Sequence, residues 1–188
     1  MNEEETNEII EVLHSNDGSE RSRARQAIVS SGKQAARVLI PLLSDPNKNV
    51  RWEACKAFSD LREPAAADAL AEALNDEDED VRWLAAEALI SLGSQAVVPT
   101  LRALQTHFNS LFVRQGAHHV LHALEREQML NLQTLSVLNT LNYLEPQISV
   151  PFAARKALES LSESKDPSPG RSGEGHHHKD TPRRREVK

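Results

Sequence analysis

An internal repeat of about 31 residues constrains the fold of this chain more than any other feature of its sequence. The segment 50–61, which opens with Val-Arg-Trp, recurs at 81–92 with the same opening, and a third copy begins at Val113 after a shift of 32 residues. A fainter copy precedes them between Arg21 and Ala35, and a last copy runs from 150 to 161. Units of this length cannot bury a hydrophobic face alone, so neighbouring copies must stack on one another.

Each copy begins with the pattern of an amphipathic helix. In the copy at 81–92, the residues that share one helical face are Val81, Ala85, Ala88, Leu89 and Leu92. A break with glycine or proline follows, because glycine can end a helix in the left-handed conformation and proline can begin the next one. A second helix then runs to Leu43, Leu74 or Leu104. The pattern predicts an all-α superhelix of about four helix pairs.

The composition favours helices over strands. Apolar residues make up 39% of the 188 residues and aromatic residues only 4%, so the core must consist mainly of Ala, Leu, Val and Ile. A single cysteine excludes an intramolecular disulfide bond and a cysteine-based zinc site. No apolar run approaches the roughly 18 residues that span a bilayer, and the first residues are acidic where a signal peptide is basic. We therefore expect a soluble, cytoplasmic protein.

The acidic loop, the Val-Arg pair, the alanine-rich stripe and the second helix together resemble the HEAT repeat family. The pattern is most similar to the HEAT-like repeat of phycobilisome lyases, over residues 20–161. The resemblance implies an inter-repeat ladder, with Arg51, Arg82 and Arg114 at the arginine positions and Asp45 and Asp76 as their loop partners. A histidine stands where a third loop aspartate is expected, and the last copy has proline in place of arginine, so the ladder weakens toward the C-terminus.

The repeats predict the domain organisation. A solenoid spans 1–161, with an N-terminal capping helix within 1–19 and repeats at about 20–45, 46–76, 77–108 and 109–145. The second helix of the fourth repeat is expected at about 132–143, and a final capping helix at 149–163. Residues 164–188 are rich in Pro, Ser, Gly, His and charge without periodicity, so we expect a disordered tail with a basic, histidine-containing composition.

Two tryptophans occupy equivalent positions of consecutive first helices and form the first candidate binding site. Trp52 and Trp83 lie on the side opposite the apolar stripe, and Ile90 shares the side of Trp83. If both rings point outward, they form an exposed apolar strip of the kind that marks partner surfaces. If each ring lies along its own helix, or packs on an arginine or loop of the adjacent repeat, it is structural.

The second helices, which normally line the concave face of such a superhelix, supply a further candidate surface. Its polar positions are Arg37, Asp68, Glu72, Arg102 and Gln105. This mixed-charge set suits a peptide or helix of a partner, or consists of solvated side chains without a binding role.

The sequence contains no complete metal or catalytic motif, and we expect no cofactor. His118 and His122 are four residues apart, as in zinc-binding helices, but no third ligand is evident nearby. The acidic run 76–80 resembles the start of a calcium loop but has valine where such a loop requires glycine. Cys55 corresponds to an alanine of the next copy, which indicates packing rather than nucleophilic chemistry. An enzyme is therefore disfavoured.

Charge and motifs favour a scaffold that binds another protein. The net charge of the chain is −6. Residues 162–188 carry a net charge of +2, so the residues before them carry a net charge near −8. An acidic body argues against binding to a phosphate backbone, although the basic tail leaves contact with nucleic acid open. Two alternatives remain: a phycobilin lyase or lyase subunit, implied by the family resemblance, and a nucleic-acid-binding HEAT protein.

Overall fold

The computed structural model describes residues 3–142 and 146–163, and every regular element in this part is a helix. The α-helices are α1 (Glu3–Leu13), α2 (Gly18–Val29), α3 (Ala35–Leu42), α4 (Lys48–Leu61), α5 (Ala67–Glu72), α6 (Glu79–Ser91), α7 (Val97–Thr106), α8 (Leu111–Arg126), α9 (Leu132–Leu141) and α10 (Pro146–Glu163). Short 3-10 turns precede α3, α5 and α7, and η3 (Ala73–Asn75) follows α5. The predicted all-α class is confirmed.

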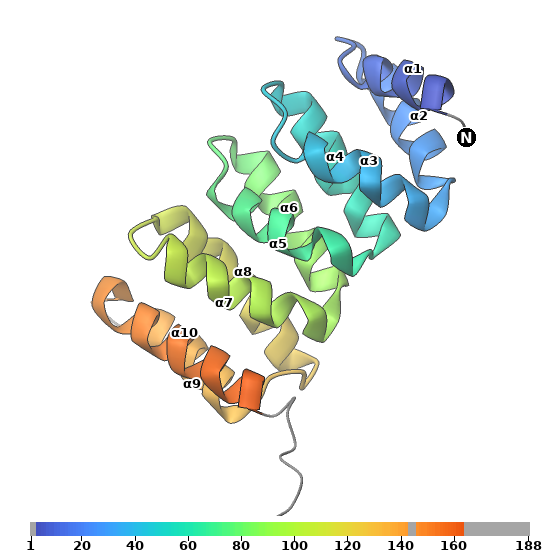
Figure 1. Cartoon of the computed structure of the whole chain (residues 1–188). Coiled ribbons are helices and arrows are strands. Elements are labelled where there is room, and N and C mark those ends of the chain that lie inside the picture. Colours follow the sequence, from blue (N-terminus) through green and yellow to red (C-terminus); the bar gives the residue numbers. More distant parts are fainter. Residues whose placement is uncertain (1–2, 143–145, 164–188) are drawn as a thin grey trace, which may run out of the picture.

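The helices stack as a solenoid in sequence order, from α1 at one end to α9 and α10 at the other (Figure 1). The first helices α2, α4, α6 and α8 pack on one another in one row, and α5 packs on α7 in a second row. Val50, Val81, Val113 and Val150 are all completely buried. The valines of successive copies are therefore equivalent positions of one continuous core, as the repeat predicts.

Left-handed residues end the first helices at equivalent positions. Gly32 and Gly93 have φ angles of +64° and +61°, and Arg62 takes the same conformation with φ +50°. After the longer helix α8, Gln128 has φ +58°. Each first helix of the four pairs is thus followed by a residue in the left-handed region, which reverses the chain toward the second helix.

One glycine within a helix marks a close approach between repeats. Gly116 lies in the middle of α8, where a glycine costs helix stability relative to alanine. A Cβ atom at this position would lie 2.9 Å from Cδ2 of Leu74, which belongs to η3 of the second repeat and is fully buried. The missing side chain therefore lets α8 pack tightly against the preceding repeats.

The C-terminal pair departs from the predicted arrangement. We expected 132–143 to provide the second helix of the fourth repeat and 149–163 to cap the solenoid. The structure has α9 in the first of these segments, but it is α10 that packs along both α7 and α9. The reason is an apolar stripe in α10 that is longer than that of α9, with Val150, Ala154 and Ala157 fully buried. The helix also begins at Pro146, before the expected start.

The predicted disordered tail, 164–188, lies outside the described residues. Within the part of the chain that the structure describes, no helix combines the length and the hydrophobicity needed to cross a lipid bilayer.

Candidate protein-interaction surface

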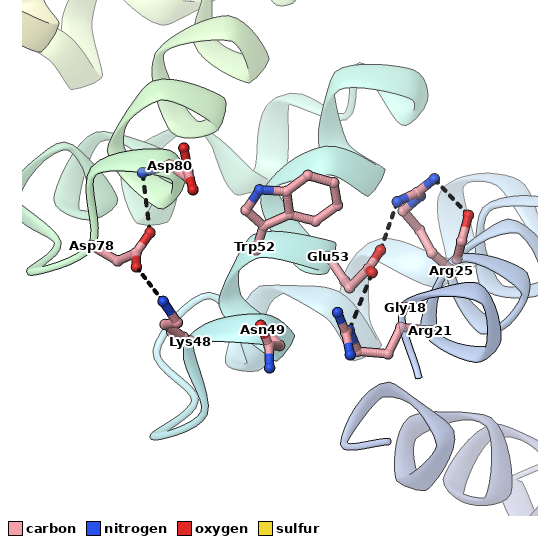
Figure 2. A pocket seen from close by; sticks show the side chains of 10 residues that line it. Gly18, Arg21, Arg25, Lys48, Asn49, Trp52, Glu53, Asp78 and Asp80 are labelled. Carbon is pink, nitrogen blue, oxygen red and sulfur yellow. Dashed lines mark hydrogen bonds and ion pairs between the residues drawn. The ribbon is translucent and has the colours of Figure 1, made fainter. Parts of the chain in front are cut away.

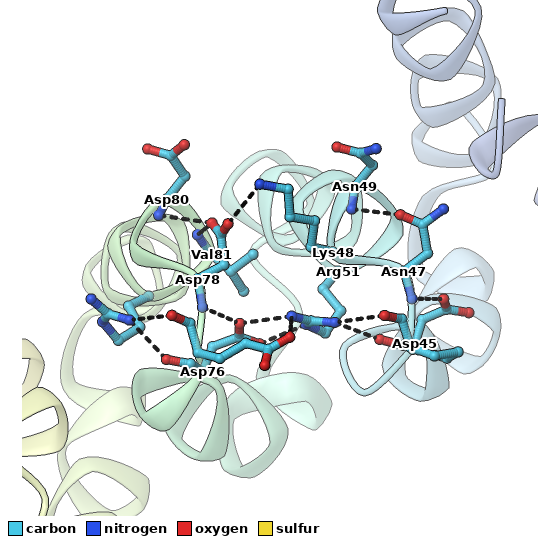
Figure 3. A network of polar contacts seen from close by, with 12 residues as sticks. Asp45, Asn47, Lys48, Asn49, Arg51, Asp76, Asp78, Asp80 and Val81 are labelled. Carbon is cyan, nitrogen blue, oxygen red and sulfur yellow. Dashed lines mark hydrogen bonds and ion pairs between the residues drawn. The ribbon is translucent and has the colours of Figure 1, made fainter. Parts of the chain in front are cut away.

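A set of arginines closes the inter-repeat loops in the same way in every repeat. Each arginine donates from Nη1 to the backbone carbonyl six residues earlier, with N–O distances of 2.8 to 2.9 Å. The pairs are Arg21 with Ser15, Arg51 with Asp45, Arg82 with Asp76 and Arg114 with Phe108. This bond is local in sequence and fixes the loop that leads into the first helix (Figure 3).

Among the described residues, Arg51 alone of these arginines also bonds a carboxylate of the following inter-repeat loop. Its Nε and Nη2 atoms donate to the two carboxylate oxygens of Asp76 at 2.7 and 2.9 Å, and both side chains are only 8% exposed. This hydrogen bond raises the pKa of the Arg51 guanidinium, with burial acting in the opposite direction. Asp45, the other predicted loop partner, lies 3.3 Å from the imidazole of His14 instead.

The third loop replaces charge with aromatic and aliphatic side chains. Arg82 has no carboxylate partner there, and its guanidinium carbon lies 4.0 Å from the ring centroid of Phe112. Phe108, Leu111 and Phe112 are 39%, 55% and 43% exposed, although loop residues and the starts of helices are polar in the two preceding copies. The inter-repeat contact therefore changes from ionic to cation–π between the second loop and the third.

Trp83 is held at the surface by the following repeat. Its ring stacks on the imidazole of His119 in α8, with centroids 4.7 Å apart, and remains 56% exposed. The Nε2 atom of His119 lies 2.8 Å from a carboxylate oxygen of Glu87 in α6. The indole is therefore exposed but fixed in position. We call Trp83, Phe108, Leu111 and Phe112 the aromatic edge.

Trp52 has different surroundings. It is half-buried, packs against the core, and lies 5.9 Å from the guanidinium carbon of Arg25 in α2. Ile90 is also half-buried against the core. Each tryptophan thus follows a different one of the two alternatives. Trp83 points outward, whereas Trp52 packs on an arginine of the adjacent repeat.

Trp52 lines a pocket of about 360 Å³ between α2, α4 and α6 (Figure 2). The side chain of Lys48 reaches Asp78 at the start of α6 with an N–O distance of 3.1 Å. That hydrogen bond lowers the pKa of the Asp78 carboxyl, and the same carboxylate caps α6 by accepting from the backbone amides of Asp80 and Val81.

The second-helix candidates form exposed inter-repeat pairs. Arg102 lies 3.3 Å from Asp68, and Glu72 lies 2.7 Å from Nε2 of His107. Arg37 and Gln105 are exposed. Pairs as exposed as Asp68 and Arg102, at 71% and 60%, contribute little stability, so these residues remain available to a partner.

The histidine and cysteine candidates show no arrangement for metal or nucleophilic chemistry. His118 and His122 stack with ring centroids 6.0 Å apart, and Nε2 of His118 lies 3.0 Å from the side-chain oxygen of Asn142. Among the described residues, no group of three His, Cys, Asp or Glu side chains could hold a metal ion. Burial raises the pKa of the Cys55 thiol to about 12, so the thiolate is strongly disfavoured.

Sequence reasoning missed the residues of the aromatic edge other than Trp83, together with its support His119. A signal was present, because Leu111 and Phe112 occupy the repeat positions of Glu79 and Asp80. Two further exposed apolar side chains, Leu132 at 80% and Phe152 at 74%, lie on the terminal helices α9 and α10. These helices follow α8, so both residues lie on other elements than the aromatic edge.

Comparisons with known proteins agree with the helical-repeat architecture. The family model described as HEAT repeats matches residues 6–90 and 68–138. No curated protein matches the sequence. A solved complex of CpcE and CpcF of phycocyanin lyase from Nostoc sp. PCC7120 is 20% identical, with a TM-score of 0.57, and the match covers 83% of this chain and 99% of that chain.

Designed proteins also match at lower similarity. A designed armadillo repeat protein in complex with the peptide (KR)4 is 19% identical with a TM-score of 0.40, and the match covers 84% of this chain and 88% of that one. An engineered protein is 18% identical, also with a TM-score of 0.40, over 86% of this chain and 80% of that chain.

Proposed function

This chain belongs to the HEAT repeat proteins, and from that premise we propose that it is a non-catalytic scaffold that binds another protein through its aromatic edge. The observation that carries the proposal is the indole of Trp83, which is 56% exposed yet held by the stack on His119. A large aromatic side chain fixed in this way loses little further conformational entropy on binding. Such residues are typical anchors of protein interfaces.

Three further exposed apolar side chains lie at the junction between α6 and α8. Leu111 and Phe112 begin α8, and Phe108 lies in the loop before it, so three apolar side chains adjoin one inter-repeat junction. Phe112 is further oriented by the guanidinium of Arg82. An apolar cluster with a polar rim is the composition of an interface core.

Affinity purification from native lysate followed by mass spectrometry tests this function. We expect specific partners to be captured by the wild-type protein and lost by Trp83→Ala combined with Leu111→Ser. Phe152→Ala is the matched control, because Phe152 is equally aromatic and 74% exposed but lies on α10. Circular dichroism melts verify that each variant folds.

Two results would contradict the scaffold proposal. One is the absence of any protein enriched above background. The other is retention of every partner by the double variant at the level of the Phe152→Ala control, which would show that the aromatic edge is not the interface.

A second candidate function is that of a bilin lyase or lyase subunit acting on phycobiliproteins. The finding that favours it is the match to the phycocyanin lyase complex, which extends over 99% of that chain. At 20% identity, this match establishes the fold alone. Mixing the protein with a bilin and an apo-phycobiliprotein should produce a new visible absorbance band if the lyase function is correct, and an unchanged spectrum removes it.

A further inference from the structure

The pocket beside Trp52 has two walls of different charge. Figure 2 shows Trp52 in the middle, with Asp78 and Asp80 at the start of α6 on one side and Arg21 and Arg25 of α2 on the other. Ser22, Gly18, Lys48, Asn49 and Glu53 complete the lining. The pocket therefore lies across three consecutive first helices.

On the α2 side, the charges of the pocket are engaged within the protein. Glu53 is 2% exposed and lies 2.6 Å from Nη1 of Arg25 and 3.5 Å from Nε of Arg21. Arg21 also donates to the carbonyl of Ser15. The two arginine side chains are only 16% and 12% exposed. The Nε atoms of both arginines lack a hydrogen-bond partner but are buried, so this wall is an ion cluster with little charge accessible to a ligand.

On the α6 side of the pocket, one of the two carboxylates has no ion-pair partner among the described residues. Asp78 is neutralised by Lys48 and caps the helix, whereas the side chain of Asp80 is exposed and has no partner among the described residues. The half-buried Asn49 also lines the pocket and carries no charge. The accessible, unpaired charge of the pocket is therefore negative.

We propose that this pocket receives an arginine side chain of the protein partner, stacked on the indole of Trp52 and paired with the carboxylate of Asp80. This inference rests on the scaffold function proposed above and specifies the chemistry of the partner. A planar guanidinium suits both contacts, because it stacks on an aromatic face and can bind a carboxylate with two donors. Arg25 lies 5.9 Å from the same indole and covers part of it, but Trp52 is only half-buried, so part of the ring remains open to a ligand.

The alternative ligand, an anion, does not fit the same geometry. The cations that line the pocket pair with Glu53 and Asp78, and Asp80 would repel an incoming carboxylate or phosphate. The Nε atoms of Arg21 and Arg25 have no hydrogen-bond partner, but they are buried and so not accessible to an anion. Asp80 lies one helical turn before Trp83 on α6, so a single partner can contact the pocket and the aromatic edge together. The net charge of −6 also favours a basic partner.

A titration of the purified full-length protein tests the pocket. The probe is a 12-residue peptide, acetylated and amidated at its ends, with three arginines separated by Gly-Ser. Binding is measured by isothermal titration calorimetry and by the NMR signal of the Trp52 indole N–H. We expect binding that shifts this signal. Replacing arginine with lysine should weaken it, and replacing arginine with neutral citrulline should abolish it.

Two variants that remove the same charge locate the site. Asp80→Asn should weaken peptide binding about 5-fold, as expected for loss of one solvent-accessible, charge-assisted contact. Asp68→Asn, which removes another exposed acid on the second-helix row, should change affinity less than about 2-fold. Lys48→Ala should strengthen binding, because it frees the Asp78 carboxylate and removes a repelling cation.

The outcomes separate this inference from the scaffold function. Equal effects of Asp80→Asn and Asp68→Asn, or undiminished binding of the citrulline peptide, would overturn the arginine pocket. If Trp83→Ala with Leu111→Ser still abolishes capture of partners from lysate in that case, the scaffold function stands without the pocket. Trp52→Phe, which keeps an aromatic ring against the core, should reduce peptide binding while leaving the melting curve nearly unchanged.

Discussion

Arg51 and Arg82 occupy equivalent positions of consecutive repeats but have different partners. Both donate to the carbonyl six residues earlier, and only Arg51 also reaches a buried carboxylate. The difference follows from one residue in the third loop, because the position equivalent to Asp76, six residues before the arginine of the copy, is Phe108 there. The two arginines therefore provide a natural comparison between an ionic junction and a cation–π junction.

We predict that Arg51→Ala lowers the free energy of unfolding by about 3 kcal/mol, because it leaves the 8%-exposed carboxylate of Asp76 without its partner. Arg82→Ala should cost about 1 kcal/mol, since it leaves no carboxylate unpaired. Urea unfolding followed by circular dichroism measures both. Equal losses for the two variants would contradict a special role for the buried pair.

Cys55 gives the protein a predictable response to alkaline pH. Its thiol pKa is raised to about 12 by burial, above the 9.0 of an exposed thiol. The neutral thiol thus stabilises the fold fully below pH 9, and this contribution is lost as the pH rises toward 12, because only the unfolded chain ionises readily.

In urea unfolding at several pH values, Cys55→Ala should therefore lose less stability than the wild type between pH 9 and 11. The equivalent residue of the next copy is Ala86, so alanine is compatible with this position. At pH 8, an aromatic disulfide reagent that reacts with thiols should modify Cys55 far more slowly in the native protein than in urea. Rapid reaction of the native protein would mean that the side chain is not shielded.

Some residue contacts were predictable and others were not. The family resemblance implied a ladder that includes Arg51 and Asp76, and these two residues do pair. Repeat spacing cannot place His119 on Trp83, since that stack depends on the distance and rotation between α6 and α8. Likewise, the different exposure of Trp52 and Trp83 results from Arg25 on one neighbouring helix and His119 on the other.

The residues with positive φ angles that end the first helices of the first three repeats are glycine in two copies and arginine in one. Gly32, Arg62 and Gly93 end three successive first helices with positive φ angles. A side chain in this conformation is strained, whereas glycine adopts it freely. Arg62 is exposed, so its replacement does not disturb the core.

We predict that Arg62→Gly raises the free energy of unfolding by about 0.5 to 1 kcal/mol, because it relieves this strain. The reverse change, Gly32→Ala, should lower it by about 1 kcal/mol. No atom would lie within 4 Å of the new Cβ at position 32, so backbone strain alone decides the result. Thermal and urea unfolding measure both, and a destabilised Arg62→Gly would refute the strain.

Periodicity predicted the first helices well, because their stripes repeat with the same spacing. It did not predict the order of packing at the C-terminus. The segments 132–141 and 146–163 are both amphipathic, and the choice between them for packing on α7 depends on how much surface each buries there. That comparison requires the geometry of α7 and cannot be made from spacing.

For the whole molecule, the fold class followed from the repeat alone, since stacked helix pairs are the only way for such units to share a core. The site did not follow from the repeat, because the repeat describes what the copies have in common and binding uses what differs between them. The aromatic edge and the pocket beside Trp52 arise where individual copies depart from the common pattern.

The change of the inter-repeat loops from carboxylates to phenylalanines has a consequence for orientation. Along the row of first helices, charged side chains line the surface beside α4, and exposed apolar side chains line it beside α8. A linear segment lying on this row would match it in one direction only, with its cationic end toward the N-terminus of the solenoid. In the reverse direction, the cationic end of the segment would lie on apolar side chains. The solenoid should therefore bind such a segment in one chain direction and not in the other.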